Sequence, residues 1–271
     1  MRGEADRLWL WPPSLVICSR LVLFFGSSLI HSMLVGAKVA EPSAVGFLRE
    51  VADEADFVEV IAVVGNDYSF IREFDLPVVL HNKHYSRGVN FADPHKDALN
   101  RESLEFSLKL ADELCARAVI VHPESRENDG CSEDVFARLL SDYPDRRILI
   151  ESMPYDLRGR SFFAYDRESM GRLMARTGRG MCLDFAHASE AAHSLGKDPI
   201  IFVKELLSLE PAHYHISDTV LAGSEDLHLH LGEGDLPIGQ FKRLLPKDAW
   251  VTLETPPEGM KTKKDIEYLR A

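Results

Sequence analysis

The chain has 271 residues, 45% hydrophobic and 27% charged, with a formal net charge of −12. These values are typical of an ordinary soluble globular protein that is long enough to bury one large α/β core. The acidic balance gives no support to a general nucleic-acid-binding surface, which is usually basic. The four cysteines form no CxxC pair and no dense framework, which favours a cytoplasmic protein.

Residues 1–32 differ in composition from the rest of the chain. They are largely apolar, but Pro12, Pro13 and Arg20 interrupt them, so that no apolar run reaches the roughly 18 residues of a spanning helix. We expect an extension over 1–32, upstream of a folded domain over 33–271. A misassigned start, with Met33 as the true first residue, is the preferred interpretation, and a signal or membrane tether is the alternative.

From Met33 onward, runs of β-branched and aliphatic residues alternate with helical patterns. Several runs, such as AVIV and ILI, are continuous, as in parallel strands that are covered on both faces. Strands are expected near 33–39, 57–64, 77–81, 117–122, 147–151, 180–184, 212–216 and 249–254. Helices are expected over 95–115, over 132–140 after an N-cap at Ser132, and from Pro199. The alternation predicts a single-domain (β/α)8 TIM barrel, with a doubly wound open sheet as the structural rival.

Six of the expected strands end in side chains that commonly bind metals. These residues are His81, His122, Glu151, Asp184, His215 and Glu254. The carboxyl ends of barrel strands meet on one face, where TIM-barrel enzymes build their active sites. Unpaired carboxylates gathered there would repel one another unless a cation binds between them. Histidine and carboxylate groups are usual ligands of zinc and manganese, so the pattern predicts a metal site.

Three further candidate ligands lie close to these strand ends. His187 follows Asp184 by three residues, at a transition from strand to helix. Asp226 and His228 are two residues apart, which places both on one side of an extended segment. His84 and His230 are the alternatives to His81 and His228 if the predicted register is shifted.

Taken together, these residues lie in segments that resemble the endonuclease IV group, the family 2 AP endonucleases of the xylose-isomerase-like TIM-barrel superfamily. The matching segments are GAKVAEPSAVGF, LHNKHY, VIVHP, ILIESMP, MCLDFAHA, HISD, DLHLHLGEGDL and VTLETPP. The resemblance implies up to three Zn²⁺ ions and hydrolysis of DNA at abasic sites, with Glu151 and Glu254 as catalytic residues. It implies that His81 and His122 bind the first ion and that Glu151 bridges the first and second ions. The second ion would be completed by Asp184, His215 and Glu254. The third ion would be held by His187, Asp226 and His228.

The sequence departs from that family where substrate would be recognised. Lys38 stands where the first strand of the family typically carries a histidine, and the stretch between the second strand and PVVLH is short. Lys83, Arg87, Arg158 and Arg160 are candidate phosphate contacts for damaged DNA, or else ordinary solvated charges.

The alternative is a sugar isomerase or epimerase of the same superfamily. It would use one Mn²⁺ or Mg²⁺ ion held by Glu151, Asp184, His215 and Glu254, with Glu151 and Glu254 as the acid/base pair on a small sugar. A metal-binding barrel without catalysis is the third interpretation. No protein partner is inferred, and a membrane partner is expected only if the extension is a tether.

Overall fold

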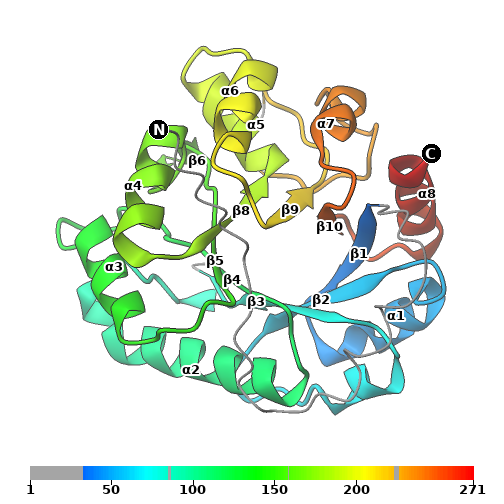
Figure 1. Cartoon of the computed structure of the whole chain (residues 1–271), viewed down its shortest axis with the longest axis horizontal. Helices are drawn as coiled ribbons and strands as arrows, with labels where there is room; N and C mark the ends of the chain where they lie inside the picture. The colour runs from blue at the N-terminus through cyan, green and yellow to red at the C-terminus, as the bar shows by residue number, and fades with distance from the viewer. Residues whose placement is uncertain (1–32, 85–86, 158, 223–225) are drawn as a thin grey trace, which may run out of the picture. The chain divides into compact units, whose positions relative to one another are not determined.

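The predicted (β/α)8 barrel is confirmed by the computed structural model, which describes residues 33–84, 87–157, 159–222 and 226–271. Eight parallel strands close in the order β1-β10-β9-β8-β5-β4-β3-β2, and helices surround them (Figure 1). Among the helices so described, none is long and apolar enough to cross a membrane. The expected extension over 1–32 lies outside the described residues.

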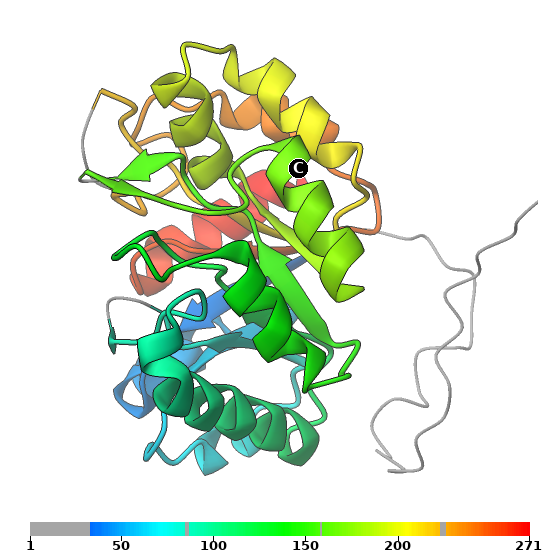
Figure 2. The ribbon, with the colours of Figure 1, turned by 90° about the vertical axis from the view of Figure 1, so that its left-hand side faces the viewer.

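All eight predicted strands are present within a few residues of the expected positions. They are β1 (Leu34–Val39), β2 (Phe57–Ala62), β3 (Val78–Asn82), β4 (Val119–Val121), β5 (Ile148–Glu151), β8 (Gly180–Asp184), β9 (His213–Ile216) and β10 (Trp250–Leu253). A short antiparallel hairpin, β6 (Asp156–Leu157) and β7 (Arg160–Ser161), follows β5 and projects at one end of the barrel (Figure 2).

The helices also follow the sequence pattern. They are α1 (Val45–Val51), α2 (Asp97–Glu113), α3 (Glu133–Ser141), α4 (Arg167–Thr177), α5 (Phe185–Ser194), α6 (Pro199–Leu207), α7 (Ile238–Leu244) and α8 (Gly259–Arg270), with 3-10 turns over Pro42–Ala44, Ser69–Glu73 and Pro94–Lys96. The predicted N-cap at Ser132 is confirmed, because its hydroxyl accepts a hydrogen bond from the Val135 amide at 3.2 Å. Pro199 begins α6, as its fixed φ angle favours.

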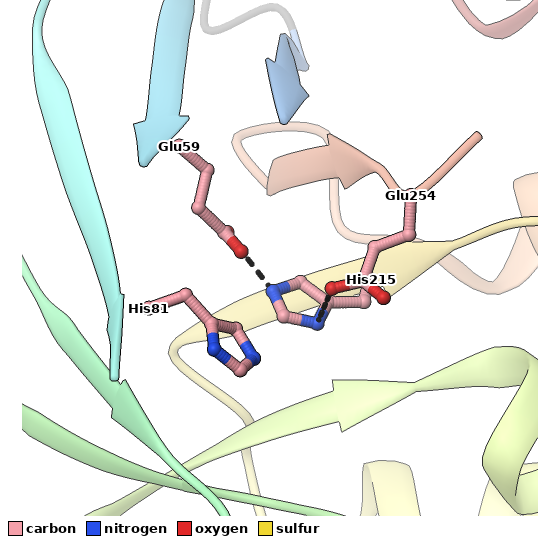
Figure 3. A group of neighbouring side chains, drawn as sticks. All are labelled: Glu59, His81, His215 and Glu254. Atoms are coloured by element: carbon pink, nitrogen blue, oxygen red, sulfur yellow. Dashed lines mark hydrogen bonds and ion pairs between the residues drawn. The ribbon is translucent and has the colours of Figure 1, made fainter. Parts of the chain in front are cut away.

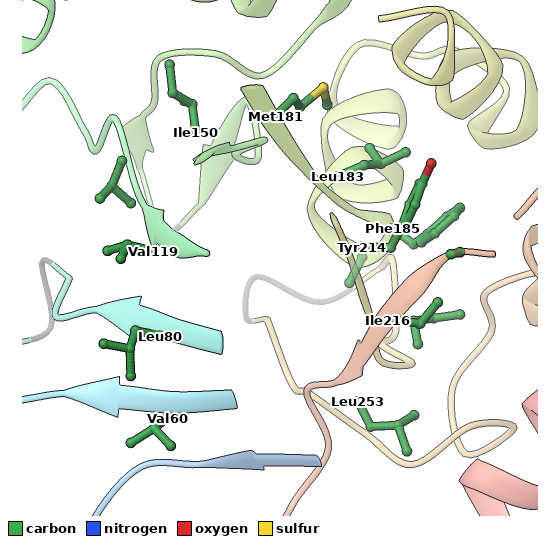
Figure 4. Packing of buried hydrophobic residues seen from close by; sticks show 14 of the residues in the cluster. Val60, Leu80, Val119, Ile150, Met181, Leu183, Phe185, Tyr214, Ile216 and Leu253 are labelled. Carbon is green, nitrogen blue, oxygen red and sulfur yellow. The ribbon is translucent and has the colours of Figure 1, made fainter. Parts of the chain in front are cut away.

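Side chains along each strand point alternately outward, towards the helices, and inward, into the barrel. Outward-facing residues such as Val60, Leu80, Ile150 and Leu253 are buried in the main apolar core, between the barrel and its helices (Figure 4). Inward-facing residues of the opposite parity form a second apolar cluster that fills the barrel interior. This cluster contains Phe57, Val79, Ala118, Ile120, Leu149 and Cys182.

The barrel interior changes from apolar to polar two residues further along the strands. Glu59 follows Phe57 by two positions, Glu151 follows Leu149, and Asp184 follows Cys182; each therefore points inward as its predecessor does. Because parallel strands all point the same way, these polar groups meet at the carboxyl end of the barrel, above an apolar plug. The fold thus places the predicted ligands in one buried layer.

Candidate metal centre

Glu151 is the carboxylate on which the candidate centre converges. It ends β5 and is fully buried. Its Oε2 atom lies 3.0 Å from His81 Nε2, at the end of β3, and 3.0 Å from His122 Nε2, just after β4. The three side chains present ligand atoms within 4.8 Å of one another. They form a candidate metal position that we call the first group.

A second group shares Glu151 with the first. Glu151, Asp184, His215 and Glu254 have ligand atoms that all lie within 4.8 Å of one another. His215 Nδ1 lies 2.8 Å from Glu254 Oε1, 3.3 Å from Glu151 Oε2 and 4.0 Å from Asp184 Oδ2. One nitrogen and three carboxylates facing one point are a ligand set that suits a divalent cation.

The third predicted group gathers around Asp226. His228 Nε2 lies 2.7 Å from Asp226 Oδ2, and His187 Nε2 lies 3.4 Å from the same oxygen. His187 is held at the start of α5, where its amide donates to the Asp184 carboxylate at 2.7 Å. Asp184 therefore caps the helix with one oxygen and faces the second group with the other. The structure brings all nine predicted ligands into these three groups.

Three of the histidines are oriented as metal ligands usually are. His81 donates from Nδ1 to the Asn82 carbonyl at 2.7 Å, and His187 does so to the Ser152 carbonyl at 2.9 Å. His228 donates from Nδ1 to the Glu254 carbonyl at 3.0 Å. A carbonyl oxygen can only accept, so in neutral histidine the other nitrogen carries a lone pair. That lone pair faces a carboxylate in each case, so a proton or a metal ion must lie between them.

Buried polar atoms without partners support the same interpretation. Among the described residues, Glu151 Oε1, Asp184 Oδ2 and Asp226 Oδ1 find no hydrogen-bond partner. A buried carboxylate oxygen without a donor is costly, and several together are rarer still. A divalent cation would satisfy them, so the residues present fit a metal centre.

Ionisation in the metal-free centre follows from burial and close charges. Burial and the neighbouring carboxylates Glu254 and Glu151 raise the pKa of Asp184 to about 6, against the pull of His187. Burial would lower the pKa of His187, but Asp184, Asp226 and Glu151 hold it well above the usual value. Protons therefore take the place of metal charge when the metal is absent.

The two register alternatives are resolved by the side-chain contacts. His81 contacts Glu151, whereas the His84 ring lies 5.2 Å from that of His122 and lines the cavity above the centre. His228 contacts Asp226, whereas His230 Nδ1 lies 2.6 Å from Asp265 in α8. His230 therefore ties the loop that carries His228 to a helix.

Two of the four predicted phosphate contacts, Arg87 and Arg160, lie close to acidic side chains. Arg87 pairs with Glu41 at 3.2 Å, and Arg160 lies 3.7 Å from Glu127. Lys83 is half-buried directly after β3. Arg158 lies outside the described residues. Lys83, Arg87 and Arg160 are not among the described residues that line the cavity over the centre.

That cavity has a volume of about 690 Å³ and mixed walls. Metal-centre residues and Lys38 form its base, while Phe47, Met153, Leu157 and Phe162 line its sides. A volume in this range is typical of a site for a small molecule or for one extruded nucleotide unit. The cavity therefore gives the centre access to a compact substrate group.

Sequence reasoning missed two charged residues beside the centre, Glu59 and Glu190, and assigned a third, Lys38, to substrate recognition rather than to the centre. Lys38 Nζ contacts the Glu254 carboxylate and lies 3.1 Å from Glu59. Glu59 Oε2 lies 3.0 Å from His215 Nε2, on the edge of the ring opposite Glu254 (Figure 3). Glu190 in α5 is 9% exposed and is one turn from His187. A charged residue inside the apolar run FVEVIA was the available signal for Glu59, because isolated charges are seldom buried without partners.

Comparisons with known proteins agree with this architecture. Residues 69–271 match a family model described as the xylose isomerase-like TIM barrel. The "Probable endonuclease 4" of Aquifex aeolicus (strain VF5) is 24% identical over 225 residues, which cover 74% of this chain and 78% of that protein.

Solved structures with the same fold include both kinds of enzyme expected above. Endonuclease IV from Thermus thermophilus has a TM-score of 0.67 at 20% identity, covering 88% of this chain and 97% of the other. A D-tagatose 3-epimerase-like protein has a TM-score of 0.64 at 19% identity, with the same coverages. L-ribulose 3-epimerase has a TM-score of 0.62 at 13% identity, covering 88% of this chain and 91% of the other. At these identities the structural likeness concerns the fold alone.

Proposed function

Because the chain belongs to the xylose isomerase-like TIM barrel family, we propose that it is a metal-dependent phosphodiester hydrolase of the endonuclease IV type, acting on DNA at abasic sites. One observation carries the proposal. Glu151 belongs to two ligand groups at once, the first with His81 and His122 and the second with Asp184, His215 and Glu254. A shared carboxylate is what a multinuclear centre requires. A one-metal isomerase would leave His81, His122 and the Asp226 group without a metal-binding role.

The proposed chemistry uses the chain's residues as ligands and as charged groups. His81, His122 and Glu151 would hold one ion, Glu151, Asp184, His215 and Glu254 a second, and His187, Asp226 and His228 a third. When bound, divalent ions would activate water and neutralise the oxygens of the phosphodiester. Glu254, at the base of the cavity, would assist proton transfer, and Glu151 would fix the distance between the first two positions. Lys83, Arg87, Arg158 and Arg160 stay candidate phosphate contacts.

A single-metal sugar epimerase is the second candidate, favoured by the cavity. Its volume of about 690 Å³ and its apolar walls suit a small substrate, and the pairing of Arg87 and Arg160 with acidic residues weakens a DNA-gripping surface. In that reaction Glu151 and Glu254 would exchange protons at a carbon next to a carbonyl, with Mn²⁺ or Mg²⁺ on the second group.

The two candidates are separated by substrate and by metal content. The hydrolase predicts two to three zinc-like ions per chain by elemental analysis, and nicking of a duplex that contains one abasic site. Glu151→Gln should reduce nicking by at least 100-fold, whereas Asp93→Asn, a buried carboxylate outside the centre, should leave it nearly unchanged. Intact duplex at high enzyme concentration, together with hydrogen exchange between a ketose and solvent and one bound Mn²⁺, would instead establish the epimerase.

A further inference from the structure

Glu59 is a buried carboxylate directly beneath the candidate metal centre. It lies on β2, points into the barrel and is fully buried. Its Oε2 atom accepts hydrogen bonds from His215 Nε2 at 3.0 Å and from the Thr252 hydroxyl at 2.7 Å. His213 Nε2 lies 3.3 Å from the same oxygen and 2.8 Å from the Thr252 hydroxyl. A network of this density on one buried oxygen fixes the Glu59 side chain in place.

The Glu59 carboxylate sets the tautomer of His215. An ionised carboxylate can only accept, so the proton on the His215 ring lies on Nε2. In the neutral ring that binds a metal, the opposite nitrogen, Nδ1, then carries the lone pair on the side of Glu254, Glu151 and Asp184. Figure 3 shows Glu59 and Glu254 on opposite edges of the His215 ring. This is the arrangement in which an outer carboxylate orients a metal-binding histidine.

Lys38 supplies the charge that allows Glu59 to be buried. Lys38 and Glu59 are register partners on the neighbouring strands β1 and β2. The Lys38 ammonium lies 3.1 Å from Glu59 Oε1 and also contacts Glu254. A buried carboxylate needs such a partner, since an unpaired buried charge is strongly unfavourable.

We propose that Glu59 is a positioning residue of the metal centre, which holds His215 so that its Nδ1 atom binds a divalent zinc-like or manganese-like ion, with Lys38 as the counter-ion of Glu59. The inference rests on the metal centre proposed above and adds to it a carboxylate–histidine–metal relay. It applies equally to the hydrolase and to the epimerase, because His215 belongs to the ligand set of both.

The test compares metal affinity in four variants of the full chain. Each is stripped of metal and titrated with Zn²⁺ against a chromogenic chelator. We expect Glu59→Gln to bind Zn²⁺ about 10–100-fold more weakly than the wild type, the range typical for the loss of an outer carboxylate. Asp93→Asn removes a buried carboxylate that bonds outside the centre, and it should keep wild-type affinity. Thermal unfolding of the metal-free proteins verifies that each is folded.

A second comparison removes the effect of an unpaired lysine. In Glu59→Gln the Lys38 ammonium keeps only Glu254 of its two carboxylate partners, and its less balanced positive charge would itself weaken metal binding. Lys38→Met and the double variant Lys38→Met/Glu59→Gln both lack this ammonium. We expect the double variant to bind Zn²⁺ at least 10-fold more weakly than Lys38→Met. Equal affinity of these two would overturn the proposal, since Glu59 would then act only as a counter-ion.

The tautomer itself gives a readout that does not depend on metal. In the metal-free wild type, the His215 Nε2 proton should give a slowly exchanging, far-downfield NMR signal. That signal should move upfield or disappear in Glu59→Gln, and its persistence unchanged would contradict the proposal. If the wild type binds no divalent ion, the proposed function falls together with this inference. If it binds Zn²⁺ and only the Glu59 comparisons show no difference, the inference alone falls.

Discussion

Four of the five histidines of the candidate centre, all except His122, are oriented by an acceptor behind the ring. His81, His187 and His228 donate to main-chain carbonyls, and His215 donates to the Glu59 carboxylate. Main-chain acceptors do not vary with side-chain substitution, so three of these four orientations follow from the backbone path alone. The fourth depends on a side chain, so among these four histidines the orientation of His215 is the one that a single side-chain substitution can remove.

Proton release should accompany metal binding at neutral pH. Close carboxylates hold the pKa of His187 well above its usual value of 6.5, so its ring carries a proton that the metal must displace. Since raising the pH removes that proton beforehand, apparent metal affinity should rise with pH above 6.5. Calorimetric titration with Zn²⁺ at pH 7 in two buffers of different ionisation enthalpy should report release of about one or more protons. Identical heats in the two buffers would be inconsistent with this assignment.

The apolar plug beneath the centre depends on a glycine in β1. A Cβ atom at Gly36 would lie 2.3 Å from the Phe57 ring, which belongs to the buried interior cluster. We expect Gly36→Ala to destabilise the fold by about 1–3 kcal/mol, as overpacking of a buried site usually does. Gly46, in α1, has open space around its Cβ position, and Gly46→Ala should stabilise the helix by about 0.5–1 kcal/mol. Urea unfolding of both variants measures the difference, and equal stabilities would refute the packing argument.

At the scale of elements, Asp218 of the HISD motif stabilises the loop between β9 and α7. The Asp218 carboxylate of HISD accepts hydrogen bonds from the amides of Thr219, Gly232 and Leu236, so the LGEG segment wraps around it. A Cβ atom at Gly234 would lie 2.4 Å from Asp218 Oδ1. Asp218 therefore shapes the loop that carries Asp226 and His228, although it is not itself in a ligand group.

Helix α5 carries Glu190, whose carboxyl group destabilises the folded chain when it is ionised. Burial, and then the negative charge of Asp226, raise the pKa of Glu190 from 4.5 to about 8. Between pH 4.5 and 8, Glu190 keeps its proton in the folded chain but has lost it in the unfolded chain. The contribution of the Glu190 carboxyl group to the free energy of unfolding is therefore present at low pH and is lost as the pH rises towards 8. Glu190→Gln should therefore be more stable than the wild type at pH 8.5, by on the order of a few kcal/mol.

The comparison is made by urea unfolding of chelated, metal-free protein at pH 5.5 and 8.5. The advantage of Glu190→Gln should shrink at pH 5.5, where the wild-type carboxyl is protonated in the folded state. Glu168→Gln, at an exposed position of α4, should show no such pH dependence. An advantage that is the same at both pH values would mean that the charge of Glu190 is not the cause.

The elements could be predicted from the sequence, but the charge pairs could not. The strands stand out because both faces of each are covered, and the ligands stand out because they end those strands. Glu59 depends on His215, which is 156 residues away, and on Lys38 in a neighbouring strand. The acidic neighbours of the candidate phosphate contacts Arg87 and Arg160, which are Glu41 and Glu127, are likewise set only by the tertiary fold. Such pairs have no local sequence signal.

At the scale of the whole domain, the barrel gathers four buried carboxylates in one region. Glu59, Glu151, Asp184 and Glu254 are all buried at the carboxyl end, above an apolar interior. In the absence of metal, the positive charges there come from Lys38 and protonated histidines. The stability of the domain should therefore depend more on whether metal ions or protons balance these carboxylates than on any surface charge, since exposed ion pairs contribute little.

Metal removal should accordingly lower the thermal stability of the whole domain. An ion that binds only the folded state stabilises it by about 2.7 kcal/mol at 100 times its dissociation constant. For a domain of this size that corresponds to a rise in Tm of roughly 5–10 °C. Calorimetric scans of chelated protein, with and without added Zn²⁺, should show this shift as one cooperative transition. The shift should be strongly reduced in Glu151→Gln, which alters the shared ligand, and retained in Asp93→Asn. Equal Tm values with and without Zn²⁺ would mean that the buried carboxylates are satisfied by protons alone, and that the centre binds no metal.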